Sequence, residues 1–177
     1  MDSTNLGIRR RDRLRGIGPA RLHGFTLIEM LITVVVLAIL IALAVPNMQD
    51  ALRKRRVIAA AEAIYGQMQF ARSEAIKRSQ DTSAVITTAS PWSVAVAGNA
   101  TVTAGNFAGV TIAATPATTV TFDGIRGLRS APAVGAGDET ITLTLGAYQL
   151  AVQVGVVGRV KLCTPAGATA VGRYPAC

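Results

Sequence analysis

Residues 21–30 read Arg-Leu-His-Gly-Phe-Thr-Leu-Ile-Glu-Met, so that Gly24 stands directly before a long apolar run. This run covers residues 25–45 and contains one carboxylate, Glu29, at its fifth position. As a helix that rises about 1.5 Å per residue it is about 31 Å long, which matches a hydrocarbon core of about 30 Å. An ionised Glu29 in that core would cost about 2.5–3.5 kcal/mol, and such a cost is normally tolerated only where a partner group is available. We therefore expect a membrane-spanning helix whose single acid finds a partner.

The motif Gly24-Phe25-Thr26-Leu27-Ile28-Glu29, preceded by an arginine-rich segment, resembles the processing site of type IV pilins and type II secretion pseudopilins. The resemblance implies that prepilin peptidase cuts after Gly24 and methylates the new N-terminal amine of Phe25. It also implies that Glu29 stays in the processed chain and pairs with that amine of a neighbouring subunit during assembly. Pro46 is residue 22 of the processed chain, where these proteins often carry a helix-bending proline.

Two simpler interpretations compete with this one. The basic segment and the sequence Ala42-Leu43-Ala44 also fit a secretory signal peptide that is cut after Ala44. A plain membrane anchor without processing is the other alternative. Both fit less well, because the apolar run exceeds the usual signal-peptide core and an anchor has no use for Glu29.

The charge distribution indicates the orientation in the membrane. Six of the 18 basic residues and two of the ten acids lie in residues 1–24, so the formal charge of +8 becomes +4 once this leader is removed. Positive charge before the span predicts a cytoplasmic leader and an exported C-terminal part. The resemblance to pilins implies a single pass through the bacterial inner membrane and a C-terminal domain in the periplasm. The run Arg53-Lys54-Arg55-Arg56 follows the span and opposes this orientation.

Cys163 and Cys177 are the only cysteines of the 177-residue chain. An even pair in an exported chain predicts a disulfide, which would stabilise the fold by about 3 kcal/mol in the chain-entropy model. Two unpaired buried thiols remain the alternative.

Residue patterns divide the rest of the chain into a helix and a β domain. The helix is predicted from a stripe of apolar residues spaced three and four apart, namely Val57, Ala61, Ile64, Met68, Ala71 and Ala75. Alternating strands are predicted at residues 83–88, 92–96, 110–113, 118–122, 140–145, 148–154 and 156–163. Short turns between them favour an antiparallel sheet.

We therefore expect an α+β fold in which a long N-terminal helix packs on a small antiparallel β domain. Its parts are a leader (1–24), a transmembrane segment (25–46), an amphipathic helix (47–80) and a β domain with a C-terminal disulfide loop (81–177). This architecture resembles the pilin fold. Residues 121–127 and 158–163 are similar to stretches of the GspH/FimT branch of minor pilins and pseudopilins.

Catalytic and cofactor chemistry finds little support in the sequence. The only histidine, His23, lies in the leader, and no phosphate-binding glycine motif is present. Asp138-Glu139 could contact a cation but is more typical of a solvated turn. We expect no enzyme activity, no cofactor and no metal site.

Five cations form a candidate binding surface for duplex DNA: Arg126, Arg129, Arg159, Lys161 and Arg173. FimT-like proteins include members that bind DNA through a Gly-Arg-x-Arg stretch, which residues 158–161 resemble with lysine in the last place. In an extended strand Arg159 and Lys161 would share one face. The alternative is that these cations serve solubility and protect a strand edge.

The sequence as a whole predicts a minor pilin-like subunit that acts by assembly with other pilins. Three roles stay open: a type IV pilus subunit, a GspH-type pseudopilin of a type II secretion system, and a receptor in DNA uptake.

Overall fold

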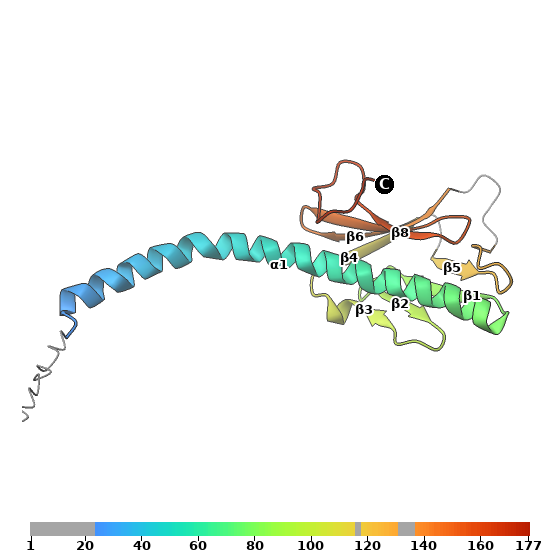
Figure 1. Ribbon diagram of the computed structural model, residues 1–177, viewed down its shortest axis with the longest axis horizontal. Coiled ribbons are helices and arrows are strands. Elements are labelled where there is room, and N and C mark those ends of the chain that lie inside the picture. The colour runs from blue at the N-terminus through green and yellow to red at the C-terminus, as the bar shows by residue number, and fades with distance from the viewer. Residues whose placement is uncertain (1–23, 116–117, 131–136) are drawn as a thin grey trace, which may run out of the picture. The chain divides into compact units, whose positions relative to one another are not determined.

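The computed structural model describes residues 24–115, 118–130 and 137–177. Its contacts divide the chain into two units, Met1–Ile41 and Ala42–Cys177. Apart from Gly24, the predicted leader lies outside the described residues. One helix, α1 (Leu27–Arg78), is followed by eight short strands within those ranges (Figure 1). The predicted α+β class with a long N-terminal helix is confirmed.

Helix α1 is continuous through the apolar run and the amphipathic stripe, and Pro46 and Gly66 lie within it. It ends where Ser79 adopts a left-handed backbone conformation with φ 52°. The amide of Gln80 donates to the carbonyl of Ala75 at 3.2 Å, which closes the last turn. The helix therefore stops two residues before the predicted limit of 80.

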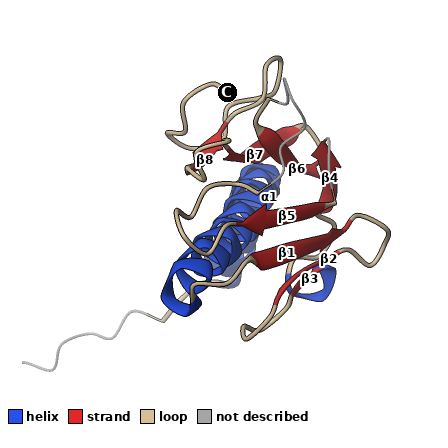
Figure 2. Cartoon of the chain, turned by 90° about the vertical axis from the view of Figure 1, so that its right-hand side faces the viewer, coloured by secondary structure: helices blue, strands red, loops and turns tan. Residues whose placement is uncertain are grey.

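The strands form two antiparallel four-stranded sheets. Their orders are β3-β2-β1-β5 and β4-β6-β7-β8, and Figure 2 shows both sheets beside α1. The strands are β1 (Thr82–Thr87), β2 (Ser93–Val96), β3 (Val102–Thr103), β4 (Thr111–Thr115), β5 (Thr119–Phe122), β6 (Glu139–Leu145), β7 (Tyr148–Val154) and β8 (Val160–Cys163).

The core of the second unit lies between α1 and the two sheets. All six residues of the predicted helical stripe are fully buried, and so is Ala60. Four of these seven helix positions are alanines, so much of the buried face of the helix consists of small side chains. The opposing sheet residues include Phe122, Ile141, Leu150 and Val152, which are also fully buried.

Two features of the β domain differ from the sequence prediction. Strand β3 and the 3-10 helix η1 (Ala104–Asn106) were not predicted, because they are too short to show periodicity. The predicted strand 156–163 is wrong in its first half, since β8 begins at Val160. Gly158 has a φ of 73°, so the chain turns here instead of extending.

Candidate functional site

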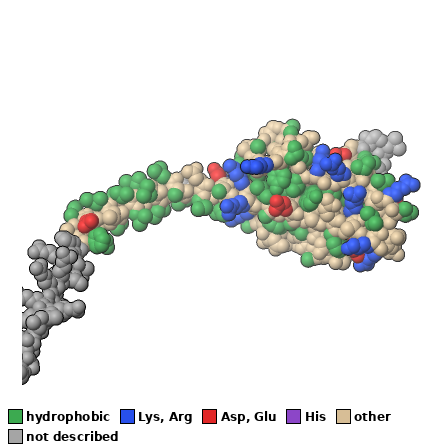
Figure 3. Space-filling view, in the orientation of Figure 1, with side chains coloured by type: hydrophobic (Ala, Val, Ile, Leu, Met, Phe, Trp, Pro, Cys, Tyr) green, Lys and Arg blue, Asp and Glu red, His purple; other side chains and the backbone are tan. Residues whose placement is uncertain are grey.

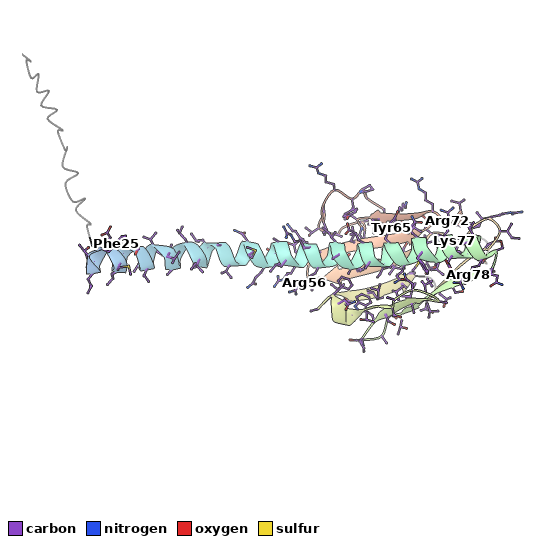
Figure 4. All side chains as sticks on the ribbon, turned by 60° about the horizontal axis from the view of Figure 1, so that its bottom comes forward. Phe25, Arg56, Tyr65, Arg72, Lys77 and Arg78 are labelled. Carbon is purple, nitrogen blue, oxygen red and sulfur yellow. A yellow bond between two sulfur atoms is a disulfide. The ribbon has the colours of Figure 1, made fainter. Side chains whose placement is uncertain are left out.

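The predicted processing site lies at the beginning of α1. Thr26 caps the helix, because its hydroxyl oxygen accepts from the amide of Glu29 at 3.2 Å and its carbonyl from the amide of Met30 at 3.2 Å. Gly24 and Phe25 precede the helix, and Phe25 is 78% exposed. Figure 4 shows Phe25 at the helix start. The bond between Gly24 and Phe25 therefore lies just before the helix begins.

Residues 25–45 present a continuous apolar surface. Their large apolar side chains are between 46% and 85% exposed, and an 18-residue window of α1 has a mean hydropathy of 3.0. Figure 3 shows apolar side chains covering this part of the helix. By length and composition α1 can cross a membrane. Such a surface requires lipid or a partner to cover it.

Glu29 lies in the first turn of this apolar helix, where a carboxylate also interacts favourably with the positive end of the helix dipole. Its carboxylate makes no hydrogen bond or ion pair within residues 24–115, 118–130 and 137–177. The acid is thus available to a group outside this chain.

A second site is formed by two loops near the C-terminal end of α1. In the first loop, residues 123–127, the Asp123 carboxylate accepts from the amides of Ile125 at 2.6 Å and Arg126 at 2.8 Å. These hydrogen bonds, with the one from Arg126 foremost, hold the pKa of Asp123 below its usual value. The amide of Gly124 also donates to Asp81 at 3.1 Å. The loop is therefore fixed by carboxylates on both sides.

The second loop, residues 155–159, packs directly on the first. A β-carbon at Gly158 would overlap the carbonyl oxygen of Gly127, so the two backbones are in contact. Arg72 of α1 donates from its Nε to that same carbonyl at 3.1 Å. Figure 4 shows Arg72 near the C-terminal end of the helix. The structure thus brings together the two stretches, 121–127 and 158–163, that carry the GspH/FimT resemblance in the sequence.

Three of the five candidate DNA-binding cations lie on or beside these loops. Arg126 and Arg159 are exposed on the two loops, and Lys161 is exposed on β8. Nζ of Lys161 lies 4.0 Å from a carboxylate oxygen of Asp138, which offsets part of its charge. Arg159 and Lys161 both line a shallow hollow of about 520 Å³. Arg159 lies in the loop before β8, whereas Lys161 lies within the strand. The two residues therefore do not share one strand face through the alternation expected from the sequence.

The other two candidate cations lie elsewhere. Arg129 is only 7% exposed, and its guanidinium donates to the carbonyls of Gly137 at 2.8 Å and Val154 at 3.2 Å. It also lies 3.8 Å from the Glu139 carboxylate. A buried, paired guanidinium cannot reach a phosphate, so its assignment to the DNA surface is wrong. The charge of Arg129 is instead compensated inside the domain, where loss of either partner would leave an uncompensated buried charge.

Arg173 is exposed but belongs to a different part of the domain. It follows Gly172, whose β-carbon position would lie 3.7 Å from Ile58. Along α1, Ile58 is about 21 Å from Arg72, so Arg173 is not part of the cluster at the two loops.

Cys163 and Cys177 form the predicted disulfide, with their α-carbons 4.9 Å apart. The tail between them is tied to α1, because the Tyr174 hydroxyl donates to Glu62 at 2.9 Å. Burial, together with this bond to a carboxylate, raises the pKa of Tyr174. Backbone bonds from Thr164 to Pro175 at 2.7 Å and from Cys177 to Thr164 at 3.0 Å complete the loop.

The residues that position the two loops were not among the predicted site residues. They are Arg72 on α1, Asp81 just before β1 and Asp123 just after β5. Asp123-Gly124 is a turn signal whose aspartate could have been recognised as an acceptor for the following amides. No signal in the sequence could pair Arg72 with Gly127, which lies 55 residues away.

Within the described ranges, no group of three or more His, Cys, Asp and Glu residues could hold a metal ion.

Family comparisons agree with the processing motif and with the fold. The prokaryotic N-terminal methylation motif matches residues 20–45. The family described as type II transport protein GspH matches residues 60–158, which is more than half of the chain. The chain belongs to the GspH family. This GspH protein is therefore of the minor pilin or pseudopilin type, a class of structural subunits, and its motif implies processing by prepilin peptidase and assembly with other pilins.

Solved structures show the same fold. The GspH protein is similar to the type IV minor pilin FimU of Pseudomonas aeruginosa, with 17% identity and a TM-score of 0.50 over 61% of this chain and 88% of that chain. A second crystal form of FimU gives 18% identity and a TM-score of 0.46 over 59% of this chain and 90% of that chain. No curated protein sequence matches this chain.

Proposed function

We propose that this GspH protein is a minor subunit of a type IV pilus. Prepilin peptidase cuts it after Gly24 and methylates Phe25, and residues 25–46 then hold it in the inner membrane with the β domain in the periplasm. Assembly moves the apolar helix from lipid into the filament, where the helices of other subunits cover it.

The observation that carries this proposal is the exposed apolar surface of residues 25–45 with the unpaired acid Glu29 near its start. A membrane anchor alone would use the apolar surface but would gain nothing from the acid. In the proposed filament the Glu29 carboxylate pairs with the methylated amine of Phe25 in a neighbouring subunit. That pairing recovers the cost of placing the acid in an apolar environment.

A substitution at Glu29 tests this pairing. We expect Glu29→Gln to leave membrane insertion and cleavage intact but to lower incorporation into sheared filaments about tenfold or more, because the charge attraction is lost while the shape is kept. The measurement is an immunoblot of filament and membrane fractions, with N-terminal sequencing of the processed chain. Asp50→Asn is the matched control, since Asp50 is an exposed acid farther along the same helix. Normal incorporation of Glu29→Gln would exclude the pairing.

A pseudopilin role in a type II secretion system is the alternative, and the description of the matched family favours it. The fold shared with the minor pilin FimU supports the pilus role. Deletion of the gene, followed by separate assays of twitching, protein secretion and transformation, distinguishes the two. Loss of secretion with normal twitching would contradict the pilus role.

Duplex DNA remains a candidate ligand because Arg126 and Arg159 project from adjoining loops and Lys161 lies two residues beyond Arg159. We expect Arg126→Gln with Arg159→Gln to weaken binding of the full chain in detergent and to flatten its salt dependence by about two units of slope. Lys77→Gln with Arg78→Gln, which removes the same charge from the last turn of α1, is the control. Equal effects of the two double variants would show that only net charge matters.

A further inference from the structure

Four consecutive cations encircle α1 shortly after its apolar run. We call Arg53, Lys54, Arg55 and Arg56 the basic collar; all four are exposed. Each residue of a helix is turned about 100° from the one before, so four in succession point to all sides. Arg53 lies about 12 Å along the helix from Val45, the last residue of the apolar run. Figure 4 shows Arg56 on this part of α1.

The collar keeps most of its charge. Asp50 is the only acid between residues 30 and 61, and its carboxylate lies 3.5 Å from Arg53 in an exposed pair. Lys54 lies 5.1 Å from the centre of the Tyr148 ring, a contact that does not neutralise it. Arg55 and Arg56 have no ion pair within the described residues. Three positive charges therefore remain uncompensated.

The surface between the apolar run and the collar is also apolar in part. Met48 is 63% exposed and Leu52 is 45% exposed. The order along the helix is therefore a fully apolar segment, a mixed segment and a ring of cations. That order matches the order of layers in a bilayer, from hydrocarbon through the interface to the phosphate headgroups.

We propose that the basic collar binds anionic phospholipid headgroups on the exported face of the membrane. This inference rests on the proposed function, which places residues 25–46 in the bilayer. Long arginine and lysine side chains can extend along the helix to reach the phosphates while their stems cover apolar surface. Clusters of four or more basic residues beside a membrane span are attracted to anionic lipid over a distance of about one Debye length, or about 8–10 Å.

Headgroups surround a spanning helix and can therefore meet cations on several of its sides. Arg53, Arg55 and Arg56 are exposed to such headgroups, whereas Lys54 lies beside Tyr148 of the β domain. Positive charges normally lie on the cytoplasmic side of a membrane span, and the collar lies on the exported side. Binding to anionic lipid would explain this position. The collar holds the helix at its depth before assembly and must release its lipids when the subunit enters the filament.

Lipid selectivity tests the collar. The full chain is reconstituted in phosphatidylcholine bilayers with spin-labelled phosphatidylglycerol or spin-labelled phosphatidylcholine, and electron paramagnetic resonance measures the relative affinity for each. We expect a preference for phosphatidylglycerol that falls at least threefold in Arg55→Gln with Arg56→Gln and is kept in Arg55→Lys with Arg56→Lys. High salt should weaken the preference in the parent chain.

The matched control is Arg126→Gln with Arg159→Gln, which removes two exposed cations from the loops that pack on α1 near Arg72. Arg72 is about 40 Å along the helix from Val45, beyond the reach of the headgroups. The leader arginines are present in every variant and contribute equally. The control should keep the lipid preference of the parent chain.

Two outcomes would overturn the proposal. An unchanged preference in the collar variant excludes lipid binding by the collar, and an equal loss in the control shows an effect of net charge alone. An unchanged preference combined with poor filament incorporation would assign the collar to a neighbouring subunit. Failure of the membrane placement on which the collar rests is seen separately, because alkali would then extract the parent chain from the membrane. A pseudopilin role would leave that placement intact and is recognised instead by the secretion and twitching assays.

Discussion

Gly158 shows how a single residue can join two parts of the chain. It combines a φ of 73° with a position where a side chain would overlap the carbonyl oxygen of Gly127. Glycine tolerates both conditions because it has no β-carbon. The contact leaves the Gly127 carbonyl oriented to accept from Arg72. The contact places the two loops that carry Arg126 and Arg159 against each other.

Gly158→Ala should therefore destabilise the β domain more than a change in backbone conformation alone would. The matched control is Gly167→Ala, where φ is 77° and nothing lies within 4 Å of the added carbon. We expect a loss of about 1 kcal/mol in the free energy of unfolding for the control. Gly158→Ala should lose about 1–3 kcal/mol more, because packed backbone must move. Denaturant unfolding in detergent measures both, and equal losses would refute the close contact.

Arg129 was predicted as an exposed DNA-binding residue, and the structure shows that this prediction is wrong. A cation in a basic C-terminal half was expected at the surface, yet it is buried with Glu139 and two carbonyl groups. Its charge is compensated within the fold, and only the exposed cations can act on a ligand.

Helix α1 has two different surfaces, an apolar one in its first part and an amphipathic one in its second part. Its first part is apolar on all sides, which is typical of a segment surrounded by lipid or by other helices. Its second part is apolar on the stripe that packs against the sheets, and several residues of that stripe are fully buried alanines. The same helix can therefore bind a β domain at one end and exchange lipid for subunits at the other.

Close packing at the alanines of the stripe can be tested by enlargement. Ala71 is fully buried against the β domain, whereas Ala59 is exposed on the same helix. We expect Ala71→Leu to lower the free energy of unfolding by about 1–3 kcal/mol because the interface is overpacked. Ala59→Leu should change it little, since both residues are strong helix formers. Denaturant unfolding measures the free energy of unfolding of both variants. An unchanged value for Ala71→Leu would contradict tight packing between the helix and the β domain.

Covalent and hydrogen bonds connect segments of the β domain and of α1 that are far apart in the chain. The disulfide between Cys163 and Cys177 and the hydrogen bond from Tyr174 to Glu62 bind the C-terminal tail to β8 and to α1. Because Cys177 is bonded to β8 and Tyr174 to α1, the C-terminal tail links the β domain to the helix.

Removal of the disulfide should loosen this tie. We expect Cys163→Ser with Cys177→Ser to lose about 3 kcal/mol of unfolding free energy, mainly because the unfolded chain gains freedom. Hydrogen exchange of residues 164–177 should rise, while exchange in β6 and β7 should change less. Thermal unfolding and exchange mass spectrometry provide the measurements. Unchanged stability in the double variant would show that the other contacts hold the tail alone.

The sequence by itself determined the features that depend on neighbours along the chain. The length of the apolar run, the position of Glu29, the three-and-four spacing of the helical stripe and the turns between strands are all local patterns. These patterns were sufficient for the α+β class, the long helix and most strands. An even cysteine pair was sufficient for the disulfide.

Only the tertiary structure decided which loops meet and which charges stay exposed. Gly127 and Gly158 are 31 residues apart, and Arg72 is 55 residues from Gly127, so no local pattern links them. The burial of Arg129 and the late start of β8 likewise follow from how the strands pack. Such contacts depend on long-range packing, whereas periodicity reports only the faces of single elements.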